Sequence, residues 1–265
     1  MGIRPVADFE TLNYQIMTNL DASTEATITD ETAIGFIPCY RLPFLSLFHA
    51  DCMEIMKQYP DKYFDLAIVD PPYGIKEHGQ RPNRRTDRWN CPPKEIKYKR
   101  VKWDNEAPNE LYFKELQRIS KNQIIFGANH FISKIPFDSS CWIVWDKKTA
   151  GDFADCELAW TSFNTAVRKF EWLWSGFRKE KPQERIHPTE KPIQLYEFCI
   201  KNYTKEGMKL LDTHFGSGSI ALAVDKANRL DKMNLHLTAC EIDKEYIDKA
   251  IKRISESIKQ GTLSF

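Results

Sequence analysis

Strand-like and helix-like segments alternate through the last third of this chain, and no other feature constrains its fold as strongly. Short apolar runs at residues 208–211 and 235–240 have the length of buried strands, and helical patterns surround them at 193–202, 220–228 and 244–258. The last helical pattern repeats apolar residues at three- and four-residue spacing: Ile247, Ala250, Ile251, Ile254 and Ile258. Because strands that alternate with helices form parallel sheets, the sequence predicts an α/β fold with a single doubly wound, mostly parallel sheet and helices on both faces.

The preceding part of the chain supplies further strands and helices. Strands are expected at 45–49, 66–69, 123–126, 141–145, 157–162 and 169–174, and helices at 51–58 and 108–119. The helix at 108–119 is expected to turn four apolar residues inward: Leu111, Phe113, Leu116 and Ile119. Residues 1–40 are polar and weakly patterned, so we expect an N-terminal extension of unassigned role there, followed by one large domain at 41–265.

Composition argues against several classes of protein. No stretch approaches the roughly 18 uninterrupted apolar residues of a membrane span, and the N-terminus lacks the pattern of a signal peptide. We therefore expect a cytoplasmic protein with no membrane partner. The seven cysteines are scattered and form no Cys-x-x-Cys pair, so neither a metal site nor a disulfide framework is expected.

A long loop at 74–106 concentrates positive charge on a chain whose net charge is only +1. Between Lys76 and Lys102, ten basic residues face three acidic ones. A basic block on a neutral protein is typical of a nucleic-acid contact, although a solvated loop is an alternative. The candidate contacts are Arg81, Arg84, Arg85, Arg88, Lys97, Lys99, Arg100 and Lys102. Segment 147–186, rich in tryptophan and basic residues, is a second candidate, but tryptophans in strands are more often part of the core.

The expected strand at 66–69 runs directly into Asp70-Pro71-Pro72-Tyr73. Two adjacent prolines force the backbone to turn at the edge of the sheet, where open α/β folds bind their ligands. The turn offers a carboxylate, a carbonyl and a flat ring, a set that suits a planar amino group on an aromatic ring. The alternative is that Asp-Pro-Pro only ends the strand and begins an ordinary loop.

A second motif, Asp212 to Ser219, lies between an expected strand and an expected helix. Its glycines, Gly216 and Gly218, allow a tight turn and close approach of a ligand, but the lysine of a phosphate-binding loop is missing. Glu241 ends the next strand, near the spacing at which an acid receives ribose hydroxyls. A nucleoside cofactor without phosphates fits this pattern better than a dinucleotide.

With His187-Pro188-Thr189-Glu190-Lys191-Pro192 between them, these motifs resemble the β class of amino-directed DNA methyltransferases over roughly residues 45–258. The resemblance implies a Rossmann-like methyltransferase fold with circularly permuted motif order, in which the catalytic motif precedes the S-adenosylmethionine motif. It implies a cofactor site at Asp51, Cys52, His187, Thr189, Lys191, Asp212, His214, Phe215, Gly216, Ser217, Gly218, Ser219 and Glu241. The family commonly has Asp-Pro-Phe-x-Gly-Ser-Gly, so either His214 or Phe215 is the aromatic residue that covers the cofactor.

The resemblance further implies methylation of a flipped adenine at N6 in double-stranded DNA. Asp70, Pro71, Pro72 and Tyr73 form the catalytic motif: the Asp70 carboxylate and Pro71 carbonyl accept hydrogen bonds from the amino group, and Tyr73 stacks on the base. An acid at position 70 favours adenine, with N4-cytosine methylation as the close alternative and a catalytically silent DNA-binding module as a more distant one. A homodimer is an expectation from the family, and a cognate restriction enzyme is left open.

Other methyltransferase classes fit less well. A C5-cytosine enzyme needs a nucleophilic cysteine, usually in Pro-Cys-Gln, whereas residues 38–40 read Pro-Cys-Tyr. Protein-glutamine and ribosomal-RNA methyltransferases usually carry Asn-Pro-Pro-Tyr and place the cofactor motif first. The order and the acid at position 70 therefore favour DNA.

Overall fold

The computed structural model describes residues 35–75, 106–135, 137–148, 154–175, 178–179, 186–187 and 189–262. The chain divides into two units, Met1–Ile37 and Pro38–Phe265, and all described helices and strands belong to the second. Nearly all of the expected extension at 1–40 and of the basic loop at 74–106 lies outside the described residues.

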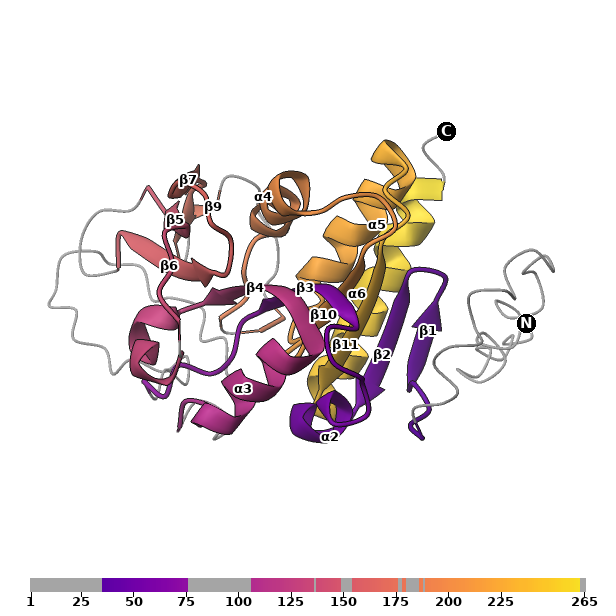
Figure 1. Cartoon of the computed structure of the whole chain (residues 1–265). Helices are drawn as coiled ribbons and strands as arrows, with labels where there is room; N and C mark the ends of the chain where they lie inside the picture. Colours follow the sequence, from indigo (N-terminus) through magenta and orange to yellow (C-terminus); the bar gives the residue numbers. More distant parts are fainter. Residues whose placement is uncertain are drawn as a thin grey trace, which may run out of the picture. The chain divides into compact units, whose positions relative to one another are not determined.

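A sheet of nine described strands forms the centre of the second unit, in the order β1-β2-β11-β10-β3-β4-β6-β5-β7 (Figure 1). The strands are β1 (Tyr40–Leu42), β2 (Leu45–His49), β3 (Phe64–Val69), β4 (Ser120–Phe126), β5 (Trp142–Asp146), β6 (Cys156–Thr161), β7 (Arg168–Glu171), β10 (Lys209–Asp212) and β11 (His236–Glu241). The five strands from β2 to β4 in this order are mutually parallel, whereas β1 and β6 run antiparallel to their neighbours. The predicted mostly parallel sheet is therefore confirmed.

Helices cover both faces of this sheet. They are α2 (Cys52–Met56), α3 (Glu110–Ile119), α4 (Ile193–Tyr203), α5 (Ser219–Asp231) and α6 (Lys244–Thr262). Figure 1 shows α2 and α3 on one face and α4, α5 and α6 on the other. Because both faces are covered, the central strand β3 is apolar and buried at every residue except Asp65.

Helix α3 corrects one detail of the sequence analysis. Leu111 was expected in the core but is 60% exposed, whereas Tyr112 is buried together with Phe113, Leu116 and Ile119. Positions 112, 116 and 119 form one stripe of the helix, and Leu111 lies well to the side of that stripe. Tyr112 can be buried in the core because its hydroxyl forms a hydrogen bond of 2.6 Å with Thr213 Oγ1.

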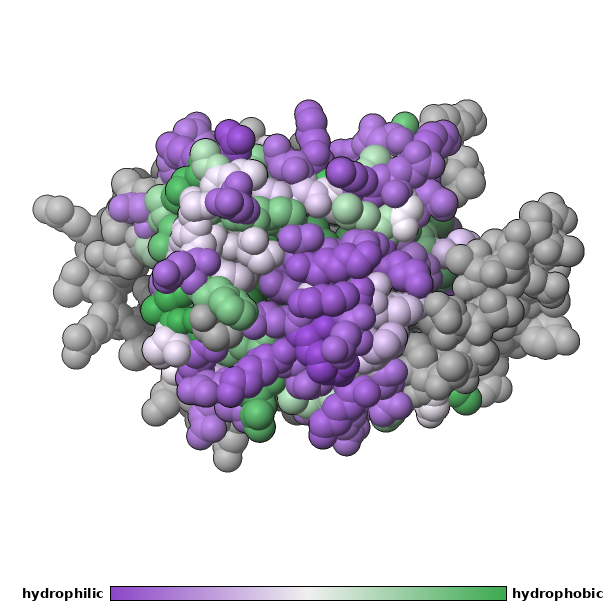
Figure 2. Space-filling model, viewed as in Figure 1, coloured by the Kyte–Doolittle hydropathy of each residue, from purple (hydrophilic) through white to green (hydrophobic). Residues whose placement is uncertain are grey.

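Short elements complete the fold. Two 3₁₀ turns, η3 (Ala128–His130) and η4 (Ile132–Lys134), follow β4. The segment expected to be one strand at 169–174 is divided between β7 and β8 (Trp174–Ser175), and β8 pairs with β9 (Arg178–Lys179) in a separate two-stranded sheet. Figure 2 shows that the surface over α3 is largely hydrophilic, with smaller hydrophobic areas elsewhere on that face. Of the helices in the described part of the chain, none combines the length and the apolar character that crossing a bilayer requires.

Candidate active site

The two sequence motifs meet at one edge of the sheet. Strands β3 and β10 are parallel neighbours, with Leu66 opposite Leu210 and Ala67 opposite Leu211, so the residues that follow them leave the sheet on the same side. Asp70 follows β3, and the Asp212–Ser219 turn follows β10. Open α/β sheets bind ligands at this carboxyl edge. The structure therefore brings the predicted catalytic and cofactor motifs together.

Asp70 is bonded through both carboxylate oxygens. Its Oδ1 accepts a hydrogen bond of 2.8 Å from the Tyr73 hydroxyl, and its Oδ2 forms an ion pair with Lys191 Nζ. The Asp70 side chain is 16% exposed and that of Lys191 is 4% exposed. Burial raises the pKa of Asp70 above its ordinary value, and the Lys191 ammonium acts in the opposite direction. Lys191, expected in the cofactor site, thus contacts the Asp70 carboxylate of the predicted catalytic motif.

Tyr73 lies against the end of β4. Its ring stacks on His130, with centroids 5.0 Å apart and planes inclined by 17°, and its hydroxyl accepts a 3.0 Å hydrogen bond from Lys191 Nζ. Gly127 has φ +66°, and a Cβ at that position would lie 2.1 Å from Tyr73 Cε1. Only glycine leaves room for the ring. Sequence analysis missed Gly127 and His130, although the Gly-Ala-Asn-His run directly after an expected strand was a signal for them.

Glu157 is a further site residue that sequence analysis missed. It lies near the start of β6, which runs antiparallel to β4, so it reaches the edge where β4 ends. Its Oε2 lies 3.6 Å from Lys191 Nζ, and its Oε1 forms an ion pair with Lys147. Burial acts to raise the pKa of Glu157, but the two lysines outweigh burial and lower it.

The turn after β10 is built on two glycines in the left-handed region. Gly216 has φ +51° and Gly218 has φ +70°. The Gly216 N–H donates a 2.9 Å hydrogen bond to Glu241 Oε2, while Glu241 Oε1 accepts from the Ile242 and Asp243 N–H groups. The Glu241 carboxylate is therefore fixed in position at the end of β11.

Asp51 lies close to Glu241 along the same edge. Strands β2 and β11 are parallel neighbours, and the Ala50 N–H donates to the Glu241 carbonyl at 3.2 Å. The Asp51 side chain caps α2 by accepting a 2.7 Å hydrogen bond from the Met53 N–H. The neighbouring Cys52 is largely buried, and burial raises the pKa of its thiol to about 12. The two acids, both expected in the cofactor site, therefore lie close together where the adjacent strands β2 and β11 end.

The two aromatic candidates of this turn differ in position. Phe215 is 3% exposed and packs in the hydrophobic core, whereas His214 is only partly buried. His214 Nδ1 lies 2.9 Å from Thr213 Oγ1, and burial lowers the pKa of its ring to about 4. Asp212, whose Oδ1 accepts a hydrogen bond from the His214 N–H, has its pKa raised to about 8 by burial. His214 is thus the aromatic side chain that remains near the site.

The segment around His187 is tied to the glycine turn through Arg253 of α6. Arg253 donates hydrogen bonds of 3.1 Å to the Ser217 carbonyl and to Ser219 Oγ, and its guanidinium lies 3.1 Å from Glu190 Oε1. The Thr189 hydroxyl bonds to His187 Nδ1 at 3.1 Å. Arg253 is a fourth residue that sequence analysis missed, because its position depends on how α6 packs.

The predicted DNA contacts are described only in part. Arg81, Arg84, Arg85, Arg88, Lys97, Lys99, Arg100 and Lys102 all lie outside the described residues. In the segment 147–186, Trp160 and Trp174 are 1% and 6% exposed, so they belong to the core, as the alternative interpretation has it. Among the described residues, no group of three His, Cys, Asp or Glu side chains is arranged to hold a metal ion.

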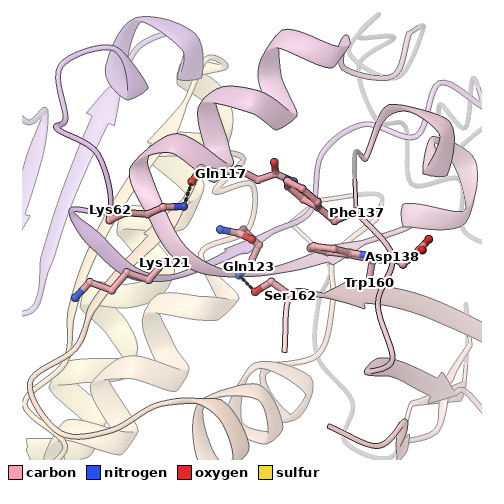
Figure 3. A pocket seen from close by; sticks show the side chains of 8 residues that line it. All are labelled: Lys62, Gln117, Lys121, Gln123, Phe137, Asp138, Trp160 and Ser162. Carbon is pink, nitrogen blue, oxygen red and sulfur yellow. Dashed lines mark hydrogen bonds between the residues drawn. The ribbon is translucent and has the colours of Figure 1, made fainter. Parts of the chain in front are cut away.

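A pocket of about 220 Å³ lies at the opposite end of the sheet (Figure 3). Lys62 precedes β3, Lys121 lies near the start of β4, and Phe137 and Trp160 form its apolar side. The amino ends of the strands therefore border this pocket, whereas the motif residues follow the carboxyl ends. The pocket is separate from the candidate active site.

Comparison with known proteins agrees with this geometry. A family model described as DNA methylase (N6_N4_Mtase) matches residues 144–252. The Type II methyltransferase M.HinfI of Haemophilus influenzae is 25% identical over 258 residues, which cover 80% of this chain and 68% of that protein. The structure of the PvuII DNA methyltransferase (cytosine-N4-specific) covers 86% of this chain and 95% of its own, with a TM-score of 0.53 and 12% identity. This last likeness concerns the fold alone, and it supports the predicted methyltransferase fold.

Proposed function

We propose that this chain, a member of the amino-directed DNA methyltransferases, transfers a methyl group to the exocyclic N6 of a flipped adenine in double-stranded DNA. The observation that carries the proposal is the Asp70 carboxylate, fixed at the end of β3 beside the turn that follows β10. The family resemblance associates an acid at this position with adenine. N4-cytosine methylation is the second candidate, because the matching family model covers both amino groups.

The cofactor is S-adenosylmethionine, which supplies a methyl group on a sulfonium. The residues present fit it. Glu241 and Asp51 offer carboxylates to hydroxyl and amino donors, and Gly216 and Gly218 let the backbone approach a ligand closely. We propose that Glu241 receives the ribose, Asp51 the adenine, and that the Asp212–Ser219 turn lines the methionine end.

The nitrogen of a nucleobase amino group is a poor nucleophile because its lone pair is delocalised into the ring. Two acceptors aimed at its hydrogens, the Asp70 carboxylate and the Pro71 carbonyl, favour a pyramidal nitrogen and free the lone pair. The same acceptors stabilise the positive charge that develops on nitrogen during attack. Asp70 must be ionised for this task, since a protonated carboxyl has an O–H donor on one oxygen and lacks the negative charge that stabilises the developing positive charge.

Tyr73 must move when the base arrives. Its hydroxyl bonds to Asp70 Oδ1, one of the two oxygens available to the amino group. An entering amino group therefore replaces this hydrogen bond, and the displaced ring stacks on the base. Flipping the base out of a duplex costs a few kcal/mol, which stacking offsets in part. In this proposal the basic loop, with Arg81, Arg84, Arg85, Arg88, Lys97, Lys99, Arg100 and Lys102, holds phosphates.

Mass spectrometry of nucleosides tests the proposal. DNA is isolated from a methylation-free host that expresses the chain or its Asp70→Ala variant. N6-methyladenine that is present with the wild type and absent with the variant is the expected result. N4-methylcytosine would keep the mechanism and overturn the assignment of the base. Unmodified DNA from folded wild type that binds S-adenosylmethionine would favour a catalytically silent module.

A further inference from the structure

We infer that Lys191 and Glu157 are positioning residues for the methyl transfer: Glu157 fixes the Lys191 ammonium, and Lys191 keeps the Asp70 carboxylate charged and oriented. This inference rests on the proposed function, and it gives Lys191 a role different from the cofactor contact that the family resemblance implies.

The contacts of the Lys191 ammonium support this role. An ammonium has three donors, and Lys191 Nζ faces three oxygens: Asp70 Oδ2, the Tyr73 hydroxyl at 3.0 Å and Glu157 Oε2 at 3.6 Å. At 3.6 Å the Glu157 contact is electrostatic rather than a hydrogen bond, so Asp70 is the closer partner. The Lys191 side chain is 4% exposed, which leaves little room for it to leave the cluster.

Charge balance explains why both residues are needed. Asp70 and Glu157 are two buried carboxylates, and a buried carboxylate without a counter-charge takes up a proton. Lys191 lies between them, while Lys147 neutralises the far oxygen of Glu157. Glu157 therefore holds the ammonium in place without leaving a net negative charge beside Asp70.

The other titratable groups around Asp70 contribute little charge. Tyr73 and, on α4, Tyr196 have pKa values raised well above 10 by burial, so both stay neutral. On β10, burial raises the pKa of Asp212 to about 8, so this acid is largely protonated at neutral pH. Lys191 is thus the dominant counter-charge of Asp70 on the elements packed around it.

The test is the pH dependence of single-turnover methylation, from pH 5 to 9, with S-adenosylmethionine and DNA bound in advance. Lys191→Met removes the counter-charge, so the pH at which the rate falls should rise by about one to three units. Glu157→Gln removes a neighbouring negative charge, so that pH should fall, and the plateau rate should fall severalfold because Lys191 is no longer fixed. Opposite shifts are expected only if both residues act through the charge of Asp70.

Three controls make the result decisive. Lys191→Arg keeps the charge and should keep a pH profile close to that of the wild type. The double variant Lys191→Met/Glu157→Gln removes one charge of each sign, so its profile should lie between those of the single variants. If Lys191→Met alone does not fold, the double variant carries the test by comparison with Glu157→Gln, because its rate should fall at a higher pH than that of Glu157→Gln. Affinity for S-adenosylmethionine should change little in every variant.

Two outcomes would overturn the inference. One is an unchanged pH profile in Lys191→Met or, where that variant does not fold, a fall in rate of the double variant at a pH no higher than in Glu157→Gln. The other is loss of S-adenosylmethionine binding in Lys191→Met with a wild-type profile at saturating cofactor, which would restore the role implied by the family. Failure of the wild type to methylate DNA would instead refute the proposed function, so the two failures are distinguishable.

Discussion

Gly127→Ala should damage the site through Tyr73, and the structure gives the size of the effect. The new Cβ would lie 2.1 Å from Tyr73 Cε1 and 2.3 Å from Cζ, far inside any van der Waals contact. Because the glycine has φ +66°, alanine there costs about 1–2 kcal/mol from backbone strain alone. The ring must also leave its place and lose its hydrogen bond to Asp70, which is worth about 1.5–3 kcal/mol with a charged partner.

A double-mutant cycle separates the two contributions. In a Tyr73→Ala background no ring remains to clash, so Gly127→Ala should cost only the backbone strain. The coupling free energy between the two positions should therefore be about 1.5–3 kcal/mol, measured from urea unfolding of the wild type, both single variants and the double variant. Additive free energies of unfolding would refute the reasoning. Methylation by Gly127→Ala should fall as well, because the Tyr73 ring is no longer placed to stack on the base.

Three further results are expected. Arg253→Met should weaken S-adenosylmethionine binding in calorimetry, because the glycine turn loses its link to Glu190. The control Arg229→Met, on α5 and 38% exposed, should leave this affinity unchanged, and equal effects of the two variants would contradict the role of Arg253. Burial lowers the pKa values of His187 and His214 to about 3 and 4, below the ordinary 6.5, so the unfolded chain binds more protons between pH 4 and 6.5. The free energy of unfolding should therefore fall by about 1–2 kcal/mol for each histidine as pH is lowered from 7 to 5. His214→Gln should make the free energy of unfolding depend less steeply on pH, and an unchanged pH dependence would argue against a neutral His214. Tyr73→Phe should keep single-turnover methylation within a few fold of the wild type, whereas Tyr73→Ala should lose about five- to 150-fold through lost stacking; similar rates for the two variants would refute the stacking role.

The sequence predicts the parts of the site that are written in local patterns. Asp70 follows a continuous apolar run, and Gly216 and Gly218 lie between a strand pattern and a helix pattern. Strands that alternate with helices are expected to run parallel, and parallel strands bring the two motifs to one edge of the sheet. The fold and the meeting of these motifs are therefore readable from the chain.

Residues that reach the site through packing were not readable in this way. Glu157 reaches the site because β6 runs antiparallel to β4, and the apolar pattern of a strand does not reveal the direction in which the strand runs in the sheet. Arg253 looks like any charged residue on an amphipathic helix until α6 is packed against the glycine turn. Tyr112 was passed over because its hydroxyl needs Thr213, which is 101 residues away along the chain.

The strand order also determines how much of the chain must be synthesised before the candidate active site can form. The early strand β2 has β11 as its parallel partner, and the early strand β3 pairs with β10. The first strands therefore cannot complete their pairing in the sheet until the last strands have been synthesised. Pairing across such sequence separations is slow, and unpaired strand edges are exposed until it is complete. Arg253, in the last helix, supplies one of the final contacts of the glycine turn. A ribosome-bound fragment that ends before β10 therefore carries Asp70 without the glycine turn beside it.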